Sequence, residues 1–183
     1  MTQRRQRHRS RLPADRNRSL PPARRRAHRS AGVLSESVGR TNLEVLARLS
    51  GQGGSRVNEM LETVDLSARA GDRVGTYSLG MKQRLGVAMA LLPDPELLVL
   101  DEPANGLDPL GTIAMRELLR GLRDQGKTIV LSSHLLGELE HLADWLVMLH
   151  EGKALFCGSA KDLLAQETSL EQLFLALVKG ERS

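Results

Sequence analysis

The sequence has little of several residue types, and each shortage excludes a class of protein. Its single cysteine, Cys157, rules out an internal disulfide framework and fits a reducing compartment. Only 2% of the residues are aromatic, and no apolar run approaches the ~20 residues that a transmembrane helix needs. With 183 residues and 40% apolar content, the chain can still form one domain with a sizeable core. We therefore expect a globular protein that is soluble unless a partner holds it.

Lysine is missing from the first forty residues, although arginine is abundant there. Residues 1–40 contain twelve arginines against Asp15 and Glu36, so their net charge is +10 and residues 41–183 are left with −6. This segment shows no apolar periodicity and contains three prolines, so we expect it to be disordered. It also lacks the apolar run of a signal peptide.

Two interpretations of residues 1–40 stay open. A basic tail could bind nucleic acid or an anionic membrane, but the absence of aromatic side chains among these arginines disfavours nucleic acid as a partner. Alternatively, arginine without lysine, mixed with Pro, Ala, His and Ser in no pattern, is what a GC-rich gene yields out of frame. In that case the true start of the protein is missing.

A helical pattern begins at Thr41. Thr41 and Glu44 predict a capped helix start, Ser55 opens a second helix, and a third runs from about Gly80 to Leu92. We interpret residues 41–93 as a helical subdomain. The apolar positions expected to face the core are Leu43, Val45, Leu46 and Leu49 in the first helix, and Val57, Met60, Leu61 and Val64 in the second.

Strands and helices alternate in residues 94–183. Leu97–Leu100 and Thr128–Ser132 are apolar runs typical of parallel strands buried on both faces. We therefore predict an α/β fold, with a parallel sheet flanked by helices. The other expected elements are a helix from about Pro109 to Arg123 with Ile113, Leu118, Leu119 and Leu122 inward, a short helix at 135–142, a hairpin of strands at 145–149 and 154–157, and terminal helices at 163–164 and 170–178.

Residues 121–128, GLRDQGKT, match the pattern of a phosphate-binding loop letter for letter. Such a loop leaves a buried strand and opens a helix, so that backbone N–H groups converge on the phosphates. Here Gly121 lies near the end of an expected helix and Thr128 begins a strand, which is the reverse polarity. We interpret Gly126 as the glycine that ends the helix and Lys127 as a solvated turn residue.

Acidic residues follow the first expected strand. Asp101 and Glu102 stand at its carboxyl end, where α/β folds form their ligand-binding crevice. Two adjacent carboxylates can divide their roles, one holding Mg²⁺ and the other polarising a water. His134 follows the second strand and should face the same crevice, whereas Ser78 and Gly80 stand at a helix N-terminus, which suits an anion.

Taken together, these segments resemble the ATPase subunit of ATP-binding cassette (ABC) transporters over about residues 41–165. Residues 77–84, YSLGMKQR, are similar to the family signature Leu-Ser-Gly-Gly-Gln with its basic extension. Residues 97–102 resemble the Walker B strand with its catalytic glutamate, 105–108 resemble the D-loop, and His134 resembles the switch histidine. The departures from the common signature are Leu79 and Met81, which stand where Gly and Gln are usual.

The resemblance implies a fold and a mechanism. The fold is an incomplete P-loop NTPase fold with a helical subdomain. Two ATPase subunits would enclose ATP and Mg²⁺ between them. They would lie in the cytoplasm, on the inner face of the cell membrane, where they bind a transmembrane permease subunit. The implied site residues are Glu102 and His134 for catalysis, Asp101 for Mg²⁺, Ser78, Leu79, Gly80, Met81 and Gln83 for the opposite subunit's nucleotide, and Asp108 for coupling of the two sites.

The family pattern is incomplete in this sequence. It has no acceptable Walker A loop, no Gln-loop strand before Thr41 and no N-terminal aromatic to stack on adenine. The contacts that hold the β- and γ-phosphates would be missing, and an apolar face of the sheet would lie uncovered. Three functions stay open. The first is an ABC ATPase subunit that is inactive alone. The second is a non-catalytic module that lends residues 78–80 to a full-length ATPase and docks on a membrane protein through residues 43–76, and the third is a nucleic-acid binder with an arginine tail.

Overall fold

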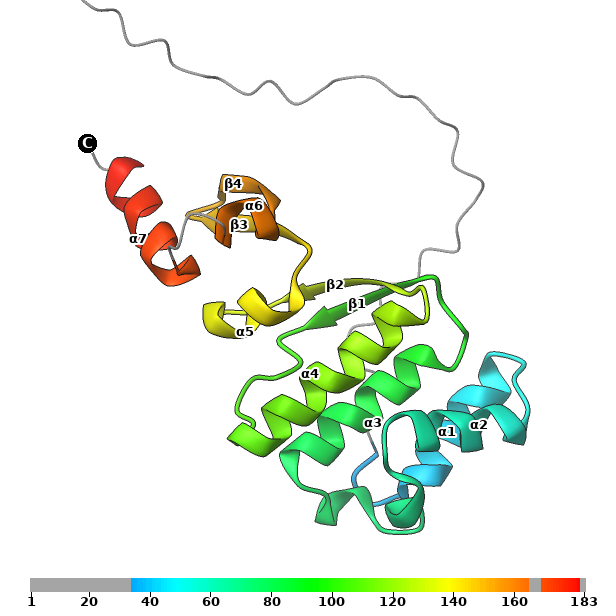
Figure 1. Cartoon of the computed structure of the whole chain (residues 1–183). Coiled ribbons are helices and arrows are strands. Elements are labelled where there is room, and N and C mark those ends of the chain that lie inside the picture. The colour runs from blue at the N-terminus through cyan, green and yellow to red at the C-terminus, as the bar shows by residue number, and fades with distance from the viewer. Residues whose placement is uncertain (1–33, 165–168, 182–183) are drawn as a thin grey trace, which may run out of the picture.

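The computed structural model describes residues 34–164 and 169–181 (Figure 1). Most of segment 1–40, including the predicted disorder, lies outside these residues. The elements near the N-terminus are α1 (Gly39–Leu49), α2 (Gly54–Thr63), the short helices η1 (Ser67–Arg69) and η2 (Val74–Thr76), and α3 (Leu79–Leu91). They are followed by β1 (Leu97–Asp101), α4 (Pro109–Asp124), β2 (Thr128–Ser132), α5 (Leu136–Leu142), β3 (Trp145–His150), β4 (Lys153–Ser159), α6 (Ala160–Leu164) and α7 (Leu170–Glu181).

The first helix begins earlier than its sequence pattern predicts. Val38 is the N-cap of α1, and no side chain caps this end, so the expected cap at Thr41 is wrong. The buried face is also different: Val45 and Leu49 are exposed, whereas Asn42 and Ala47 are buried beside Leu43. A polar side chain on the core side was not expected from apolar periodicity.

Asn42 fixes residues 34–38 to the body of the protein. Its Oδ1 accepts the Leu34 N–H at 2.8 Å, and its Nδ2 donates to the carbonyls of Leu34 at 3.2 Å and Val38 at 3.0 Å. Further on, Val38 forms a β-bridge with Arg73, and the Gly75 N–H donates to the Ser35 carbonyl at 2.8 Å. Residues 34–40 therefore contact the helices and loops that follow them, whereas the sequence pattern placed the start of ordered structure at Thr41.

Three helices form the largest part of the core. Val57, Met60 and Leu61 of α2 are buried as predicted, and α3 contributes a nearly continuous buried run from Val87 to Leu91. Figure 1 shows α3 and α4 side by side beneath β1 and β2. In α4, Met115, Leu119 and Leu122 are buried, whereas Ile113, expected to face inward, is 48% exposed because it lies on the other side of the helix.

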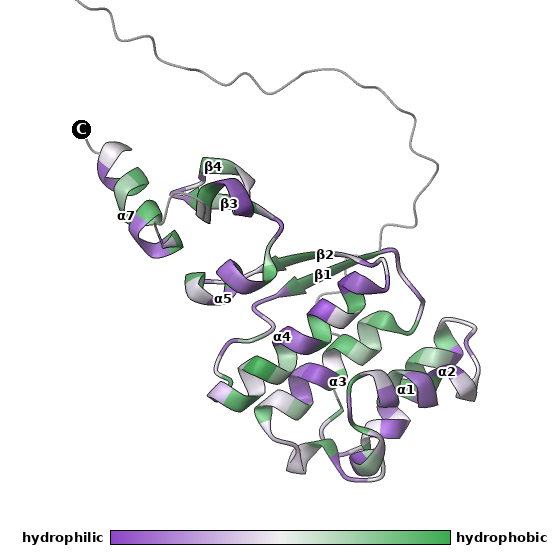
Figure 2. Cartoon of the chain, viewed as in Figure 1, coloured by the Kyte–Doolittle hydropathy of each residue, from purple (hydrophilic) through white to green (hydrophobic). Residues whose placement is uncertain are grey.

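The strands β1 and β2 pair in parallel, with Leu97 opposite Thr128 and Asp101 opposite Ser132. Helices cover one face of this pair, and both strands are strongly hydrophobic (Figures 1 and 2). On the other face Leu97, Val99 and Val130 are 46%, 37% and 52% exposed. The expectation of burial on both faces is thus wrong for the described residues, and the expectation of an uncovered apolar face is confirmed.

The turn before β2 shows that the GLRDQGKT segment is a connection from a helix to a strand. Gly121 lies inside α4, and Gly126 has a φ of +89°, a left-handed conformation suited to a residue that follows a helix. The chain then enters β2, so the helix-turn-strand order is confirmed. Lys127 is not a solvated residue, however, because its Nζ donates to Asp94 Oδ1 at 2.6 Å and its side chain is only 19% exposed.

A second, smaller core lies at the C-terminal end. The antiparallel hairpin of β3 and β4 confirms the expected hairpin, and it buries Leu146 and Met148 against α6 and α7. The rings of His150 and Phe174 pack edge to face with their centroids 5.9 Å apart, which adds a contact between α7 and the hairpin. The helices expected at 163–164 and 170–178 correspond to α6 and α7.

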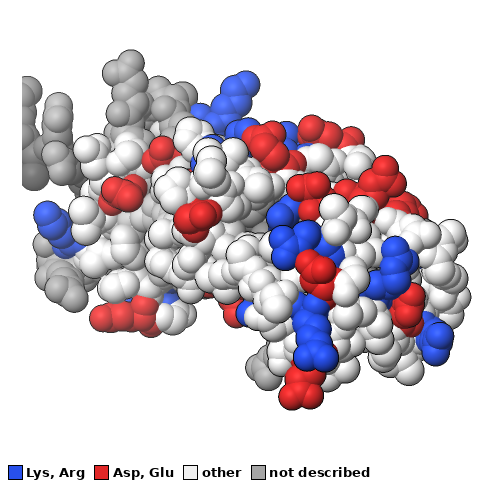
Figure 3. All heavy atoms as spheres, turned by 90° about the horizontal axis from the view of Figure 1, so that it is seen from below, with Lys and Arg blue, Asp and Glu red and all other residues white. Residues whose placement is uncertain are grey.

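The surface gives two further observations. On the face in Figure 3, acidic and basic side chains are interspersed, and neither sign forms a continuous patch there. Within residues 34–164 and 169–181, no helix combines the length and the hydrophobicity needed to cross a membrane.

Candidate functional site

The first group of predicted site residues lies at the carboxyl edge of β1 and β2. The parallel register places Asp101 beside Ser132, and Ser132 Oγ donates to Asp101 Oδ1 at 2.5 Å. The same hydroxyl accepts the Glu102 N–H at 3.0 Å. A single serine therefore orients both the carboxylate of Asp101 and the backbone of Glu102.

Ser132 is the functional residue that sequence reasoning missed. The sequence pattern places it only as the last residue of the second strand, with no role in the site. The available signal was strand register, because two parallel strands of equal length end at the same edge and bring their last residues together. Once Leu97 is paired with Thr128, the hydroxyl of Ser132 must lie opposite Asp101.

Glu102 adopts an unusual backbone conformation. Its φ is +48°, in the left-handed region that residues with a Cβ rarely occupy. Such conformations are concentrated at functional sites, where the surrounding contacts maintain them. Here the contact with Ser132 holds the Glu102 N–H, and the chain turns sharply away from β1 toward Pro103, which is buried.

His134 contacts the Glu102 carboxylate as its position after β2 predicted. The distance from His134 Nδ1 to Glu102 Oε2 is 2.9 Å, with side chains that are 60% and 30% exposed. The imidazole thus limits the rotation of the carboxylate, which remains accessible to water. Asp101, Glu102 and His134 therefore come together at one edge of the sheet.

The second group lies where α3 and α4 begin. Ser78 is the N-cap of α3, and its Oγ accepts the Met81 N–H at 3.2 Å. Asp108 caps α4 in the same way, since its Oδ1 accepts the Gly111 N–H at 2.7 Å. A Cβ on Gly111 would lie 2.8 Å from that oxygen, so the cap depends on this glycine.

The signature segment packs against the D-loop of the same chain. A Cβ built on Gly80 would be 3.7 Å from Leu107, and one on Gly106 would be 3.1 Å from Leu79. Leu79 is 48% exposed, Gly80 and Gln83 are half-buried, and Met81 packs against the main core. The departures from the common signature therefore have different consequences, because Met81 adds to the core while Leu79 adds apolar surface.

Tyr77 anchors the residue that precedes the signature. It is 4% exposed, and its hydroxyl donates to the Arg69 carbonyl at 2.6 Å. Burial, and next the nearby charge of Asp72, raise the pKa of this phenol above its ordinary value of 10.0, so it stays protonated as a donor. A Cβ on Gly39 would overlap the hydroxyl, so the start of α1 also fixes this loop.

The donor set shows which part of a Mg·ATP site these residues fit. Within the described ranges, no three His, Cys, Asp or Glu side chains gather into a metal site. One Asp101 oxygen is taken by Ser132, so this carboxylate suits contact with Mg²⁺ through a water shell rather than as part of a complete cage. Asp101, Glu102 and His134 therefore fit the water side of such a site.

Comparison with known proteins decides the family. A family model described as "ABC transporter" matches residues 3–105, more than half of the chain. This chain belongs to the ABC transporter family. The match begins at residue 3, so it also includes most of segment 1–40, which was expected to lie outside the resemblance to ABC ATPases.

Individual ABC proteins agree with the family model. The chain is 45% identical over 126 residues to the uncharacterized ABC transporter ATP-binding protein YhcH of Bacillus subtilis, covering 68% of this chain and 41% of YhcH. It is 42% identical over 133 residues to the lantibiotic transport ATP-binding protein SrtF of Streptococcus pyogenes, covering 73% and 56%. A solved ATP-binding subunit of an ABC transporter has a TM-score of 0.67 and 29% identity, covering 80% and 65%. The chain thus spans about half the length of the curated relatives it matches.

Proposed function

We propose that these residues supply an ABC transporter with the water-activating edge and the signature segment of its ATPase, and that ATP binding requires a phosphate loop from outside them. The observation that carries the proposal is the contact of His134 with Glu102 beside the Asp101–Ser132 pair. This is the arrangement expected for a carboxylate that polarises water next to a metal-bound phosphate.

Each residue at the sheet edge has a distinct proposed role. Glu102 accepts a proton from the attacking water, and His134 keeps the Glu102 carboxylate pointed at that water. Asp101, oriented by the Ser132 hydroxyl, contacts the hydration shell of Mg²⁺. Bound Mg·ATP would provide the electrophilic γ-phosphate. The N-cap of α3, with Ser78 and the free N–H groups of the first turn, would face the nucleotide of a second subunit.

ATP-binding subunits of this family generally work with permease subunits. We place the chain in such an assembly, on the inner face of a membrane, with a second ATPase subunit opposite its signature. The positions within one chain support this pair-wise arrangement, because the signature lies at the start of α3 beside the D-loop, whereas Glu102 and His134 lie at the sheet edge.

A co-sedimentation experiment with an intact ABC ATPase subunit tests this proposal. The proposal predicts a heterodimer with Mg·ATP that dissociates without nucleotide, and a weaker heterodimer for Ser78→Ala. Lys82→Ala is the matched control, because Lys82 lies in the same turn of α3 and is given no role in binding the nucleotide. Association that is indifferent to ATP would contradict the signature role.

A non-catalytic module is the second candidate function, and the exposed Leu79 favours it. An apolar residue inside the signature suits packing against another protein and gives no polar contact to a phosphate. If the chain is such a module, Glu102→Gln leaves the ATPase rate of the mixed dimer unchanged. If Glu102 of this chain contributes to hydrolysis, the same substitution lowers that rate.

A further inference from the structure

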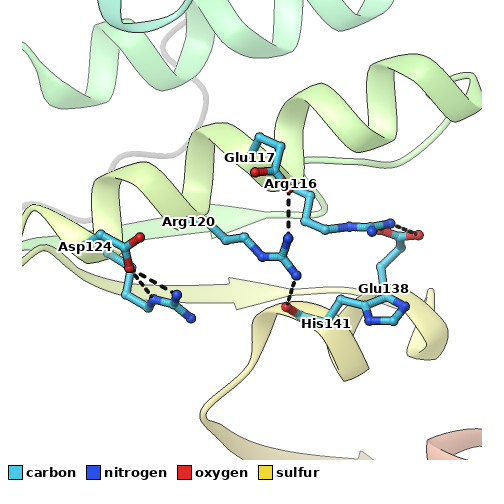
Figure 4. A network of polar contacts seen from close by, with 7 residues as sticks. Arg116, Glu117, Arg120, Asp124, Glu138 and His141 are labelled. Carbon is cyan, nitrogen blue, oxygen red and sulfur yellow. Dashed lines mark hydrogen bonds and ion pairs between the residues drawn. The ribbon is translucent and has the colours of Figure 1, made fainter.

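Three arginines form a stripe along one face of α4. Arg116, Arg120 and Arg123 are spaced by four and three residues, so their side chains point to the same side of the helix. In Figure 4, Arg116 and Arg120 reach toward Glu138 and His141 of α5. The partners of the three arginines are the Glu138 carboxylate, the His141 carbonyl at 2.9 Å from Arg120 Nη2, and Asp144 at 3.8 Å from Arg123 Nη1.

The pair of Arg116 and Glu138 is the strongest contact of this stripe. Arg116 Nε donates to Glu138 Oε2 at 3.1 Å, and Arg116 Nη2 donates to Oε1 at 2.9 Å and to Oε2 at 2.7 Å. The two side chains are only 19% and 25% exposed. A two-pronged pair that is partly shielded from water is stronger and more directional than an exposed ion pair.

Helix α5 is held by these contacts, by the packing of its leucines, and by a hydrogen bond from the Leu170 N–H to Glu140 Oε1 at 2.8 Å. It contains seven residues, no side chain caps its start, and none of its residues is fully buried. Leu142 packs against the main core, whereas Leu136 and Leu139 pack against the second core. The helix therefore bridges two cores, and the arginine stripe fixes it to the first.

Only Leu135 separates His134 from α5. The Leu135 N–H donates to Ser133 Oγ at 3.0 Å, so the segment between β2 and α5 is short and locally bonded. A shift of α5 relative to α4 must therefore move His134 relative to Glu102. The helix that bears the stripe begins at Pro109, directly after its N-cap Asp108, so it also connects the D-loop with this segment.

We propose that Arg116 and Glu138 are positioning residues, which hold α5 so that His134 Nδ1 stays on the Glu102 carboxylate. The inference rests on the proposed function for its catalytic meaning, but the geometry can be tested without nucleotide. Neither residue touches the reacting atoms.

The test is a long-range ¹H–¹⁵N NMR spectrum of the histidine side chains in the full chain. In Arg116→Lys, which keeps the charge and loses the two-pronged contact, and in Glu138→Gln, the His134 Nδ1 signal shifts toward its position in Glu102→Gln. The matched control is Glu117→Gln, because Glu117 pairs with Arg120 on the same helix but is 62% exposed. This control leaves the signal unchanged. The charge-reversed double variant R116E/E138R restores the wild-type signal.

Amide hydrogen exchange gives a second measurement on the same variants. Loss of the pair raises exchange at Leu135 by about tenfold, while Leu100 in β1 exchanges as in the wild type. If Glu138→Gln does not fold, the milder Arg116→Lys decides the question. An unchanged His134 signal in a folded Arg116→Lys protein overturns the proposal, as does an equal shift in Glu117→Gln. Failure of the chain to take part in ATP hydrolysis would not alter either signal, so the two proposals fail separately.

Discussion

Replacing Asn42 by Ala tests whether residues 34–40 belong to the folded body. Asn42 is 3% exposed and forms three hydrogen bonds with Leu34 and Val38. The two groups of Leu34 can reach water after the substitution, and the Val38 carbonyl still accepts the Asn42 N–H at 3.2 Å. We therefore expect each of the three lost hydrogen bonds to cost less than ~1 kcal/mol of unfolding free energy. With a small contribution from the cavity left by the side chain, the total loss should be about 2 kcal/mol.

Thermal unfolding, followed by circular dichroism at 222 nm, measures this loss. A change of about 2 kcal/mol lowers the Tm of a domain of this size by about 4–8 °C. The control is Asn58→Ala, because Asn58 makes one exposed hydrogen bond, from Arg40 Nη1 at 2.7 Å, and its loss should change stability by less than about 0.5 kcal/mol. Faster amide exchange at Val74 and Gly75, which donate to Ser37 and Ser35, should accompany the loss in Asn42→Ala. Equal stability of the two variants would refute the assignment of residues 34–40 to the body.

Three further predictions concern α4, the turn before β2 and the uncovered sheet face. Gly111→Ala should lower the free energy of unfolding in urea by about 1 kcal/mol, because the new Cβ disturbs the Asp108 cap. Gly121→Ala is the control and should raise that free energy by up to about 1 kcal/mol, since no other atom lies within 4 Å of its Cβ. A Gly121→Ala protein less stable than Gly111→Ala would contradict the role of the cap. The hydrogen bond from Lys127 lowers the pKa of Asp94 below 3.8, so the pair stabilises the fold above that pH and its contribution disappears as the pH falls through the lower folded-state value. The Tm values of wild type and Asp94→Asn should therefore differ at neutral pH and converge in acid, and a constant difference would show that the pair has no effect. Val130→Glu should reduce self-association, measured by light scattering as the protein is concentrated, with little change in Tm, since Val130 is 52% exposed. A large fall in Tm would show that this face of the sheet is covered.

The sequence predicted the order of the elements well, because each depends on local signals. The apolar face of α2, the run at the start of β1 and the glycine after α4 all have clear patterns, and the structure places them as expected. The first helix was less predictable. Apolar periodicity assigned Val45 to the core, but Asn42 occupies that side because its amide bonds a neighbouring segment. Periodicity contains no information about such a contact.

Prediction of the site succeeded where strand order determines position. Asp101 ends β1, Glu102 follows it directly, and His134 follows β2 closely. Because the two strands are parallel neighbours, these residues must lie at the same edge of the sheet. The role of Ser132 required the register of the strands, and the left-handed backbone of Glu102 required coordinates. The contact of Lys127 with Asp94 was missed because the two residues lie 33 positions apart in the sequence.

Titration of the purified chain with Mg·ATP tests the central claim most directly. In the proposed function, the water-activating carboxylate and the signature lie in these residues and the phosphate loop lies outside them. The proposed function predicts no binding heat up to millimolar Mg·ATP, and a spectrum of His134 and Glu102 that the nucleotide does not change. Saturable binding at micromolar concentration, with changes at the sheet edge, would show that these residues already contain a cradle for the phosphates.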